Sequence, residues 1–163
     1  MRLFIAITLS EEMKASATGA MHALKKAGVK GNYSPSANLH LTLAFIGEME
    51  NAAPVKEALQ TVSYKPFRLS FSEMGTFGDI LWIGVKGNQG LNGLAKSIRK
   101  ALDAFGIGYD KKAFSPHITL IRKMNGPWKS VPAPRGEMIV KKVSLMRSEV
   151  KGGRRVYTEI CAV

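Results

Sequence analysis

The feature that most constrains the fold is an internal repeat that ends each time in a His-x-Thr strand. The stretches "NLHLTLAFIG" (38–47) and "FSPHITLIRK" (114–123) each place a histidine two residues before a threonine inside an apolar run. The chain contains only three histidines, so two of them lie in matching contexts. One His-x-Thr tripeptide is common and carries little information. A buried strand has no use for the same polar pair twice unless the pair does chemistry.

The first copy of the repeat follows a definite order of expected elements. The apolar run over 3–9 predicts a buried strand. Ser10, followed by two acidic residues, predicts a helix start, because a serine side chain caps free N–H groups and acids suit the positive end of the helix dipole. Gly28 predicts the end of this helix. A polar loop with Pro35 then leads to a strand over 39–46, which carries the first motif.

The second copy has the same order. The run "ILWIGV" over 80–85 predicts a buried strand, and apolar residues between 91 and 105 recur at helical spacing. A loop with Pro116 leads into a strand over 117–122, which carries the second motif.

The spacing of the two copies agrees closely. Ile5 precedes the first motif histidine by 35 residues, and Ile83 precedes the second by 34. This agreement predicts an internal duplication. We expect one domain over 1–163 with two pseudo-symmetric α+β lobes and motifs at 40–43 and 117–120.

The two halves differ after their motifs. The first continues with an expected helix over 53–62 and a strand over 66–73. The second continues with a proline-rich, loop-like segment over 125–136. The chain closes with an expected hairpin over 141–163 that turns at Lys151–Arg154.

The motifs place their polar side chains on one face of each strand. Side chains alternate along a strand, so His40 and Thr42 share a face, as do His117 and Thr119. The apolar residues between them pack under the helices. If the lobes pack about a pseudo-twofold axis, the polar faces meet, with two imidazoles opposed and two hydroxyls beside them.

Two imidazoles that titrate near neutrality suit displacement at phosphorus. One deprotonates the attacking oxygen and the other protonates the leaving oxygen. Threonine hydroxyls donate to the non-bridging oxygens, and Arg122, five residues after His117, neutralises their charge. Without further information, a solvated charge at a strand end is an equally good reading of Arg122. His22 serves as a comparison, since it lies on the polar face of the first helix and is expected to be exposed and inert.

Charge and composition narrow the class of partner. Twenty-four Lys and Arg against twelve Asp and Glu give a formal charge of +12, which predicts a polyanionic partner such as nucleic acid. A generally basic surface without a specific partner is the alternative. The single cysteine, Cys161, excludes an internal disulfide and a multi-thiolate metal site. No signal peptide or membrane span is expected, which favours the cytoplasm.

Other catalytic patterns fail. "GLNGLAKS" at 90–97 has Ala95 where a phosphate-binding loop requires glycine. No Gly-x-Ser-x-Gly nucleophile elbow occurs. Two histidines without a clear third carboxylate ligand make a weak metal site, so we expect no metal and no other cofactor.

The paired motifs "HLTLAFIG" and "HITLIRK" resemble those of the two-histidine phosphoesterase superfamily, and the resemblance is nearest to its RNA 2',3'-cyclic phosphodiesterases, also called LigT-like or 2'-5' RNA ligase proteins. It extends from "RLFIAI" to "VSLMRSEVKGGRRVYTEI". The resemblance implies a bilobal α+β fold with two antiparallel sheets facing a central cleft and helices packed outside. It also implies metal-independent opening of an RNA 2',3'-cyclic phosphate to a 2'-phosphate, and in some members 2'-5' joining of RNA ends or its reversal.

The resemblance assigns roles to residues at matching positions. His40 and His117 correspond to the catalytic histidines, and Thr42 and Thr119 to the phosphate-binding hydroxyls, with Arg122 at the matching distance after the second motif. Two aromatic residues are further candidates. Phe45 occupies the mirror position of Arg122 and either stacks on the terminal base or packs in the core. Many relatives carry a tryptophan shortly before the first motif, where this chain has Tyr33, a candidate wall of the nucleobase site.

We therefore predict a monomeric hydrolase that acts on RNA with 2',3'-cyclic phosphate ends, with His117 as base and His40 as acid. One alternative is a phosphodiesterase acting on 2'-5' linked oligonucleotides or other small cyclic phosphates. Another is a basic protein that binds RNA ends without cleaving them.

Overall fold

The computed structural model describes residues 1–163 and contains two antiparallel sheets. The first sheet has the strand order β3-β1-β8-β9. Its strands are β3 (His40–Glu48), β1 (Arg2–Thr8), β8 (Ser144–Lys151) and β9 (Arg154–Ala162). The second sheet has the order β2-β6-β5-β4-β7. Its strands are β2 (Lys30–Tyr33), β6 (His117–Asn125), β5 (Ile80–Val85), β4 (Phe67–Phe77) and β7 (Glu137–Val140).

The strand orders reveal the duplication in space. In both sheets a motif strand, β3 or β6, pairs with the first strand of its own repeat, β1 or β5. A further two-strand unit, β8-β9 or β4-β7, follows on the other side. The two sheets therefore match position by position, with β2 as an additional edge strand. The expected α+β fold with two antiparallel sheets is confirmed.

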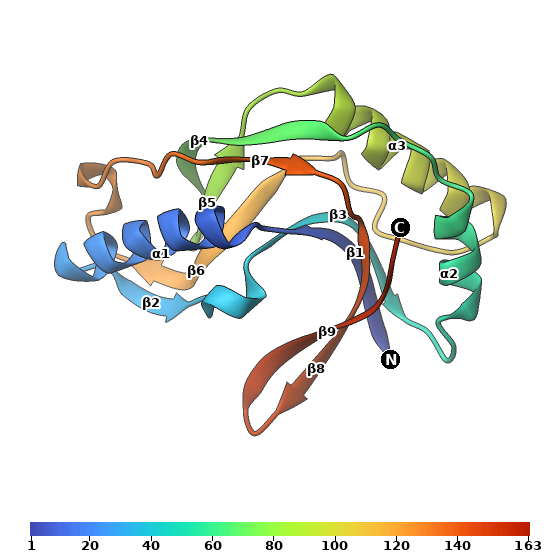
Figure 1. The fold of residues 1–163 in the computed structure, drawn as a ribbon. Helices are drawn as coiled ribbons and strands as arrows, with labels where there is room; N and C mark the ends of the chain where they lie inside the picture. The colour runs from blue at the N-terminus through green and yellow to red at the C-terminus, as the bar shows by residue number, and fades with distance from the viewer.

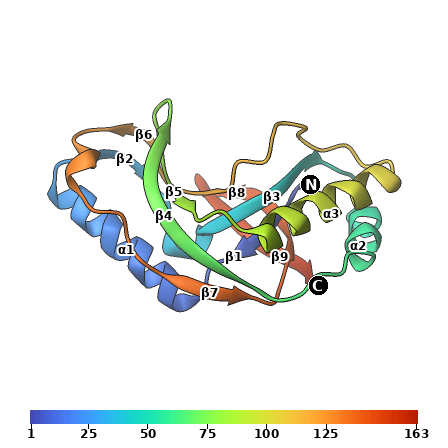
Figure 2. The same cartoon turned by 90° about the horizontal axis from the view of Figure 1, so that it is seen from above.

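Three helices cover the sheets. They are α1 (Glu11–Lys26), α2 (Ala53–Gln60) and α3 (Gln89–Ala104), and two short 3₁₀ turns, η1 (Ser36–Asn38) and η2 (Trp128–Ser130), lie in the connections. Figures 1 and 2 show α1 alongside the second sheet and α2 with α3 alongside the first. The main helix of each repeat thus lies at the end of the molecule where the other repeat's strands form their sheet. None of the three helices is both long and apolar enough to cross a membrane.

The helix starts show the same duplication. The Ser10 hydroxyl accepts the N–H of Met13 at 3.2 Å, and the Asn88 side chain accepts the N–H of Leu91 at 3.1 Å. Each cap satisfies a backbone donor that the first turn of a helix leaves free. At the other end of α1, Gly28 has a φ of 91°, a conformation that favours glycine, so the predicted end of this helix is confirmed.

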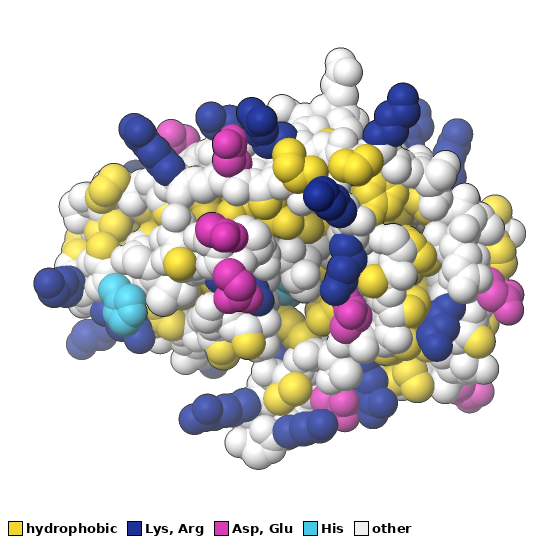
Figure 3. All heavy atoms as spheres, viewed as in Figure 1, with side chains coloured by type: hydrophobic (Ala, Val, Ile, Leu, Met, Phe, Trp, Pro, Cys, Tyr) yellow, Lys and Arg dark blue, Asp and Glu magenta, His cyan; other side chains and the backbone are white.

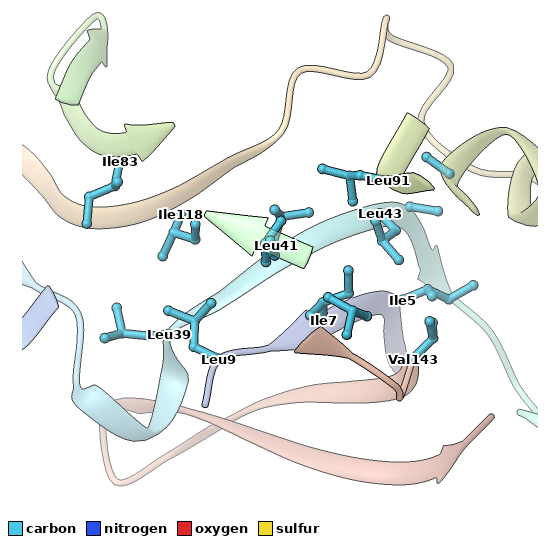
Figure 4. Close-up of a cluster of buried hydrophobic side chains, with 14 of the residues drawn as sticks. Ile5, Ile7, Leu9, Leu39, Leu41, Leu43, Ile83, Leu91, Ile118 and Val143 are labelled. Atoms are coloured by element: carbon cyan, nitrogen blue, oxygen red, sulfur yellow. The ribbon is translucent and has the colours of Figure 1, made fainter. Parts of the chain in front are cut away.

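One core connects the two sheets. Thirty-four buried hydrophobic residues form a single cluster that draws on both sheets and all three helices. In Figure 4, Leu41 and Leu43 of β3 point toward the same interior as Ile118 of β6 and Ile5 of β1. These side chains alternate with the half-buried motif residues, as the sequence pattern requires. Because one cluster is shared, we propose that the chain is a single domain.

The structure corrects the expected elements at the sheet edges. The sequence predicts a loop where β2 lies, and it does not predict β7. Both are four-residue edge strands, and β2 has no buried residue, so neither shows an apolar alternation. Their backbones nevertheless pair with β6 and β4. β4 also continues four residues past its expected end at 73. The closing hairpin is confirmed, and so is the loop predicted over 125–136, except that Asn125 is the last residue of β6.

Candidate active site

The two motif strands lie next to each other where the sheets meet. β3 and β6 are in contact although they belong to different sheets. His40 and His117 stand at the first positions of these strands. Both are half-buried, and the charge of His117 acts on His40. The structure therefore brings the two predicted histidines into one site.

His40 has a fixed ring orientation. Its Nδ1–H donates to the carbonyl oxygen of Asn38 at 2.7 Å, and its Nε2 lies 2.9 Å from the Thr42 hydroxyl. A carbonyl oxygen only accepts, so the proton of the neutral ring resides on Nδ1. In that form Nε2 accepts the Thr42 hydroxyl hydrogen. The ring consequently presents Nε2 as the atom that gains or loses a proton.

His117 repeats this geometry. Its Nδ1–H donates to the carbonyl oxygen of Ser115 at 2.7 Å, the same distance and the same two-residue separation as for His40. Thr119 lies two residues further on the half-buried face of β6. Its backbone carbonyl accepts the Ser34 hydroxyl at 3.0 Å, which ties the strand to the loop after β2. Both histidines thus have Nδ1 bound and Nε2 left for chemistry.

Aromatic side chains hold each imidazole. Phe4 and Tyr157 lie 5.0 and 5.1 Å from the His40 ring, and Tyr157 meets it edge-on at 90°. Around His117, Phe77 lies at 5.1 Å and 86°, and Trp82 at 6.3 Å. Such contacts restrict ring rotation and add packing energy.

The sequence prediction did not include these four aromatic residues. A signal existed for two of them, because Phe4 and Trp82 directly precede Ile5 and Ile83, which anchor the alignment of the repeats. Tyr157 comes from β9 and Phe77 from β4, both outside the repeated segment, and no local pattern marks them.

Matching β-bulges place Phe45 and Arg122. In the pairing of β1 with β3, Ala6 lies opposite Thr42 and Ile5 opposite Ala44, so Leu43 has no partner. In the pairing of β5 with β6, Trp82 lies opposite Thr119 and Leu81 opposite Ile121, so Leu120 has no partner. An extra residue reverses the alternation of side chains beyond it.

The consequence is visible in the burial pattern of each strand. Two buried residues follow one another, Leu43 with Ala44 and Leu120 with Ile121, and the next residue is exposed. Phe45 and Arg122 therefore emerge on the face that carries the motif histidines, five residues after His40 and His117. Without the bulge, an odd separation would place them on the opposite face.

Tyr33 does not join this group. Its hydroxyl donates to the carbonyl oxygen of Val29 at 2.7 Å, and the Lys25 ammonium lies 4.7 Å from its ring centre. Burial raises the pKa of its hydroxyl. These contacts hold the side chain against the end of α1, so they do not support its predicted role in the nucleobase site.

The electrostatic environment lowers the pKa of His40. Burial is the largest cause, and the positive charges of Arg122 and His117 lower it further, while the hydrogen bond to Asn38 acts in the opposite direction. Arg122 is thus near enough for its charge to act on His40, and its side chain is exposed. A bound anion would be attracted by the same charges.

His22, the comparison residue, is exposed on α1 as expected.

The arrangement suits acid–base chemistry on an anion. Two Nε2 atoms are available for proton transfer, Thr42 supplies a hydroxyl beside one of them, and Arg122 supplies a cation. No cluster of three His, Cys, Asp or Glu side chains gathers in the structure. The free thiol of Cys161 lies partly buried at the end of β9, and burial raises its pKa.

Comparison with known proteins shows the family of this chain. The family model of the 2'-5' RNA ligase superfamily matches residues 13–152. The RNA 2',3'-cyclic phosphodiesterase of Archaeoglobus fulgidus is 35% identical over 130 residues, covering 75% of this chain and 72% of the relative. The enzyme of the same name from Geobacillus stearothermophilus is 31% identical over 91% of this chain, which spans about half (52%) of that relative's length.

The fold is also similar to that of solved structures of this kind of enzyme. The crystal structure of E. coli LigT in its apo form superposes with a TM-score of 0.84 and 28% identity, covering 99% of this chain and 95% of LigT. The match of the family model over most of the chain, with the paired His-x-Thr strands in two matching sheets, shows that this protein belongs to the 2'-5' RNA ligase superfamily.

Proposed function

We propose that this protein opens terminal 2',3'-cyclic phosphates of RNA to 2'-phosphates by two-histidine acid–base catalysis. The enzyme class follows from the relatives, which are RNA 2',3'-cyclic phosphodiesterases, so the chain is a hydrolase of phosphodiester bonds. The observation that carries the mechanism is the pair of imidazoles whose Nδ1–H groups donate to backbone carbonyls at 2.7 Å. This arrangement leaves two Nε2 atoms to exchange protons with the substrate.

The proposed reaction breaks one bond and forms one. A water oxygen attacks phosphorus while one neutral histidine takes its proton. The bond between phosphorus and the 3'-oxygen breaks, and the other histidine, protonated at Nε2, delivers its proton to that oxygen. The product carries a 2'-phosphate and a free 3'-hydroxyl. The two histidines end in exchanged protonation states, and proton exchange with solvent restores them.

The neighbouring side chains bind the phosphate in this proposal. The hydroxyls of Thr42 and Thr119 donate to its non-bridging oxygens, and Arg122 compensates the charge that grows on them. The Thr42 hydroxyl donates to His40 in the free site and turns toward phosphate when substrate binds. In this proposal Phe45 stacks on the terminal base, which its 48% exposure and its position 6.1 Å from the ring of Phe4 support.

The assignment of the two histidines needs its own test. The predicted assignment makes His117 the base and His40 the acid. The lowered pKa of His40 favours the neutral ring in the free protein. To act as the acid, His40 must gain a proton when the phosphate anion binds beside Arg122. A substrate with sulfur in place of the bridging 3'-oxygen separates the roles, because a thiolate leaves without protonation. It restores turnover to the variant that lacks the acid and not to the variant that lacks the base.

The main experiment uses a short RNA with a 2',3'-cyclic phosphate end in the presence of a chelator. We expect a 2'-phosphate product, and His40→Ala and His117→Ala should each lower kcat by about 10²- to 10⁴-fold, the usual contribution of a general acid or base. His22→Ala is the matched control, since it removes an exposed imidazole. Near-wild-type turnover by either site variant would refute the two-histidine mechanism. RNA binding that survives both substitutions, without turnover by the wild type, would favour a binding protein.

Joining of RNA ends is a second candidate activity, and the name of the matching family favours it. A 5'-hydroxyl in place of water would attack the cyclic phosphate and produce a 2'-5' linkage with the same proton transfers. A 2'-5' linked dinucleotide tests the reverse reaction, which should yield a cyclic phosphate and a 5'-hydroxyl. If the protein cleaved this dinucleotide but did not act on cyclic-phosphate RNA, 2'-5' joining and its reversal would replace hydrolysis as the proposed main activity.

A further inference from the structure

The hairpin of β8 and β9 extends away from the first sheet. β8 and β9 pair from Ser144 with Ala162 to Lys151 with Arg154, whereas β1 pairs with β8 only as far as Ser148. The distal part of the hairpin has no other strand beside it, and Figure 1 shows it projecting from the body of the molecule. The turn is tight, because Gly152 and Gly153 have φ values of 57° and 75°. We call residues 147–157 the basic arm.

The basic arm carries an excess of positive charge. It contains four cations, Arg147, Lys151, Arg154 and Arg155, and one acid, Glu149. Glu149 pairs with Arg147 at 3.1 Å and with Lys151 at 4.0 Å. Arg154 and Arg155 form no ion pair, and Arg155 only donates to the Ser148 hydroxyl. In Figure 3 the lower projection of the molecule, where the hairpin lies, bears Lys and Arg side chains.

The arm is physically continuous with the catalytic site. The carbonyl oxygen of Arg155 accepts the side-chain amide of Asn38 at 3.0 Å, and the Asn38 carbonyl accepts the Nδ1–H of His40. Tyr157 meets the His40 ring edge-on. Arg155 lies two residues from Tyr157 and hence on the same face of β9. Arg154 is one residue further and pairs with Lys151 beside the turn, so these two cations lie about 10 Å along the strand from the tyrosine, at the tip of the hairpin and on its opposite face.

The opposite hairpin has the reverse charge. β4 and β5 turn at Gly78–Asp79, and this hairpin holds Phe77 against His117, as the basic arm holds Tyr157 against His40. Between positions 73 and 80 it contains Glu73 and Asp79 and no cation. The two sides of the site therefore present unequal potentials to a polyanion. The phosphates of a bound strand are therefore attracted more strongly to the basic arm than to the β4-β5 hairpin.

We propose that the basic arm binds the phosphate backbone of the RNA strand upstream of its cyclic end. The terminal nucleotide occupies the histidine site, and the strand leaves past Tyr157 along β9, with its next phosphate near Arg155 and the following ones around the tip of the hairpin, where Arg154 and Lys151 lie. The protein thus selects a single-stranded RNA end over a cyclic mononucleotide. This inference rests on the proposed function, because it takes the cyclic end to lie at His40 and His117.

The test compares a cyclic-phosphate-ended single-stranded RNA with a 2',3'-cyclic mononucleotide. In Lys151→Ala/Arg154→Ala, the ratio of KM for the RNA to KM for the mononucleotide should rise roughly fivefold or more. Binding of the product RNA, followed as a function of salt, should lose about 1.4 from the slope of log Kd against log salt, because each contact to a single strand contributes about 0.7. The charge-preserving pair Lys151→Arg/Arg154→Lys should keep both values.

The matched control removes two exposed cations elsewhere. Lys96 and Lys100 line a 500 Å³ groove on α3 together with Arg99, which makes that groove the rival path for RNA. If Lys96→Ala/Lys100→Ala lowers the salt slope and the arm variant does not, the strand runs over α3 and the proposal is wrong. If the protein bound polyglutamate through the arm as tightly as it binds RNA, the proposal would also be wrong. Failure of the wild type to hydrolyse either cyclic substrate would instead refute the proposed function.

Discussion

Gly75 provides a sharp test of how the second sheet supports the histidine. Gly75 of β4 lies opposite Trp82 of β5. A Cβ atom added at Gly75 would lie 2.5 and 2.6 Å from Cη2 and Cζ2 of the Trp82 ring. Real Cβ atoms do not approach carbon so closely, so the indole must move. Phe77 lies 5.0 Å from Trp82 and 5.1 Å from His117, and a displaced indole therefore disturbs the aromatic contacts of the catalytic imidazole.

The loss of stability expected for Gly75→Ala follows from these contacts. Overpacking of this kind costs about 1–3 kcal/mol of unfolding free energy. A protein of this size loses about 3 °C of Tm per kcal/mol, so Gly75→Ala should lower Tm by about 3–9 °C. Gly93→Ala is the matched control. Gly93 lies within α3, its added Cβ meets nothing within 4 Å, and the change should stabilise the helix by about 0.5–1 kcal/mol.

Differential scanning calorimetry measures both variants, and turnover of a cyclic mononucleotide shows whether His117 is disturbed. We expect Gly75→Ala to lower kcat in addition to Tm and Gly93→Ala to raise Tm without loss of kcat. A second change, Trp82→Phe in the Gly75→Ala background, removes part of the ring and should recover stability. If Gly75→Ala had the same Tm as the wild type, the reasoning that the indole is packed directly over Gly75 would be refuted.

Three further predictions concern charge, pH and the core. Arg122→Gln should lower kcat/KM about 10- to 150-fold, the equivalent of 1.5–3 kcal/mol for a hydrogen bond to a charged group. It should also raise the pKa of His40, measured by NMR titration, because a positive charge that lowers it is removed; an unchanged or lower pKa would contradict this. The pKa of His40 is lowered in the folded protein. Between pH 6.5, its ordinary pKa, and this lower value, the imidazole therefore binds a proton in the unfolded chain but not in the folded one. Urea unfolding should therefore show stability falling as pH drops from about 6.5 toward the folded pKa, and His40→Asn should flatten this slope, with His22→Asn as control. Leu41→Ala, at a fully buried position, should cost about 2.7–5 kcal/mol, whereas Val150→Ala, 62% exposed, should change stability by less than about 0.5 kcal/mol.

The repeat can be recognised in the sequence because it depends on local patterns. The strand over 80–85, the caps and ends of α1, and the face shared by His40 and Thr42 all follow from side-chain periodicity and from residues close in the chain. The His-x-Thr pairs are recognisable for the same reason. Two copies at matching distances identify the histidines, although spacing along the chain does not by itself require them to meet in space.

The edge strands and the outer parts of the site cannot be recognised in this way. β2 pairs with β6 through its backbone alone, and backbone hydrogen bonds leave no side-chain pattern. Tyr157 reaches His40 from a strand more than one hundred residues away, which only the pairing of β8 with β1 brings near. Tyr33 is the opposite case, since its position near the motif in sequence suggests a role that its hydrogen bond to Val29 does not support.

The sequence by itself thus determined the duplicated α+β architecture and the identity of the two histidines, since both are encoded in short-range periodicity and spacing. Tertiary structure alone decided that Tyr157 and Phe77 accompany them, because both come from strands outside the repeat. The unpaired Leu43 and Leu120 reverse the alternation of β3 and β6, and this reversal turns Phe45 and Arg122 toward the site. A bulge forms where one strand has an extra residue that no residue of its partner faces. It depends on how the two strands pair, so it cannot be read from the sequence of either strand alone.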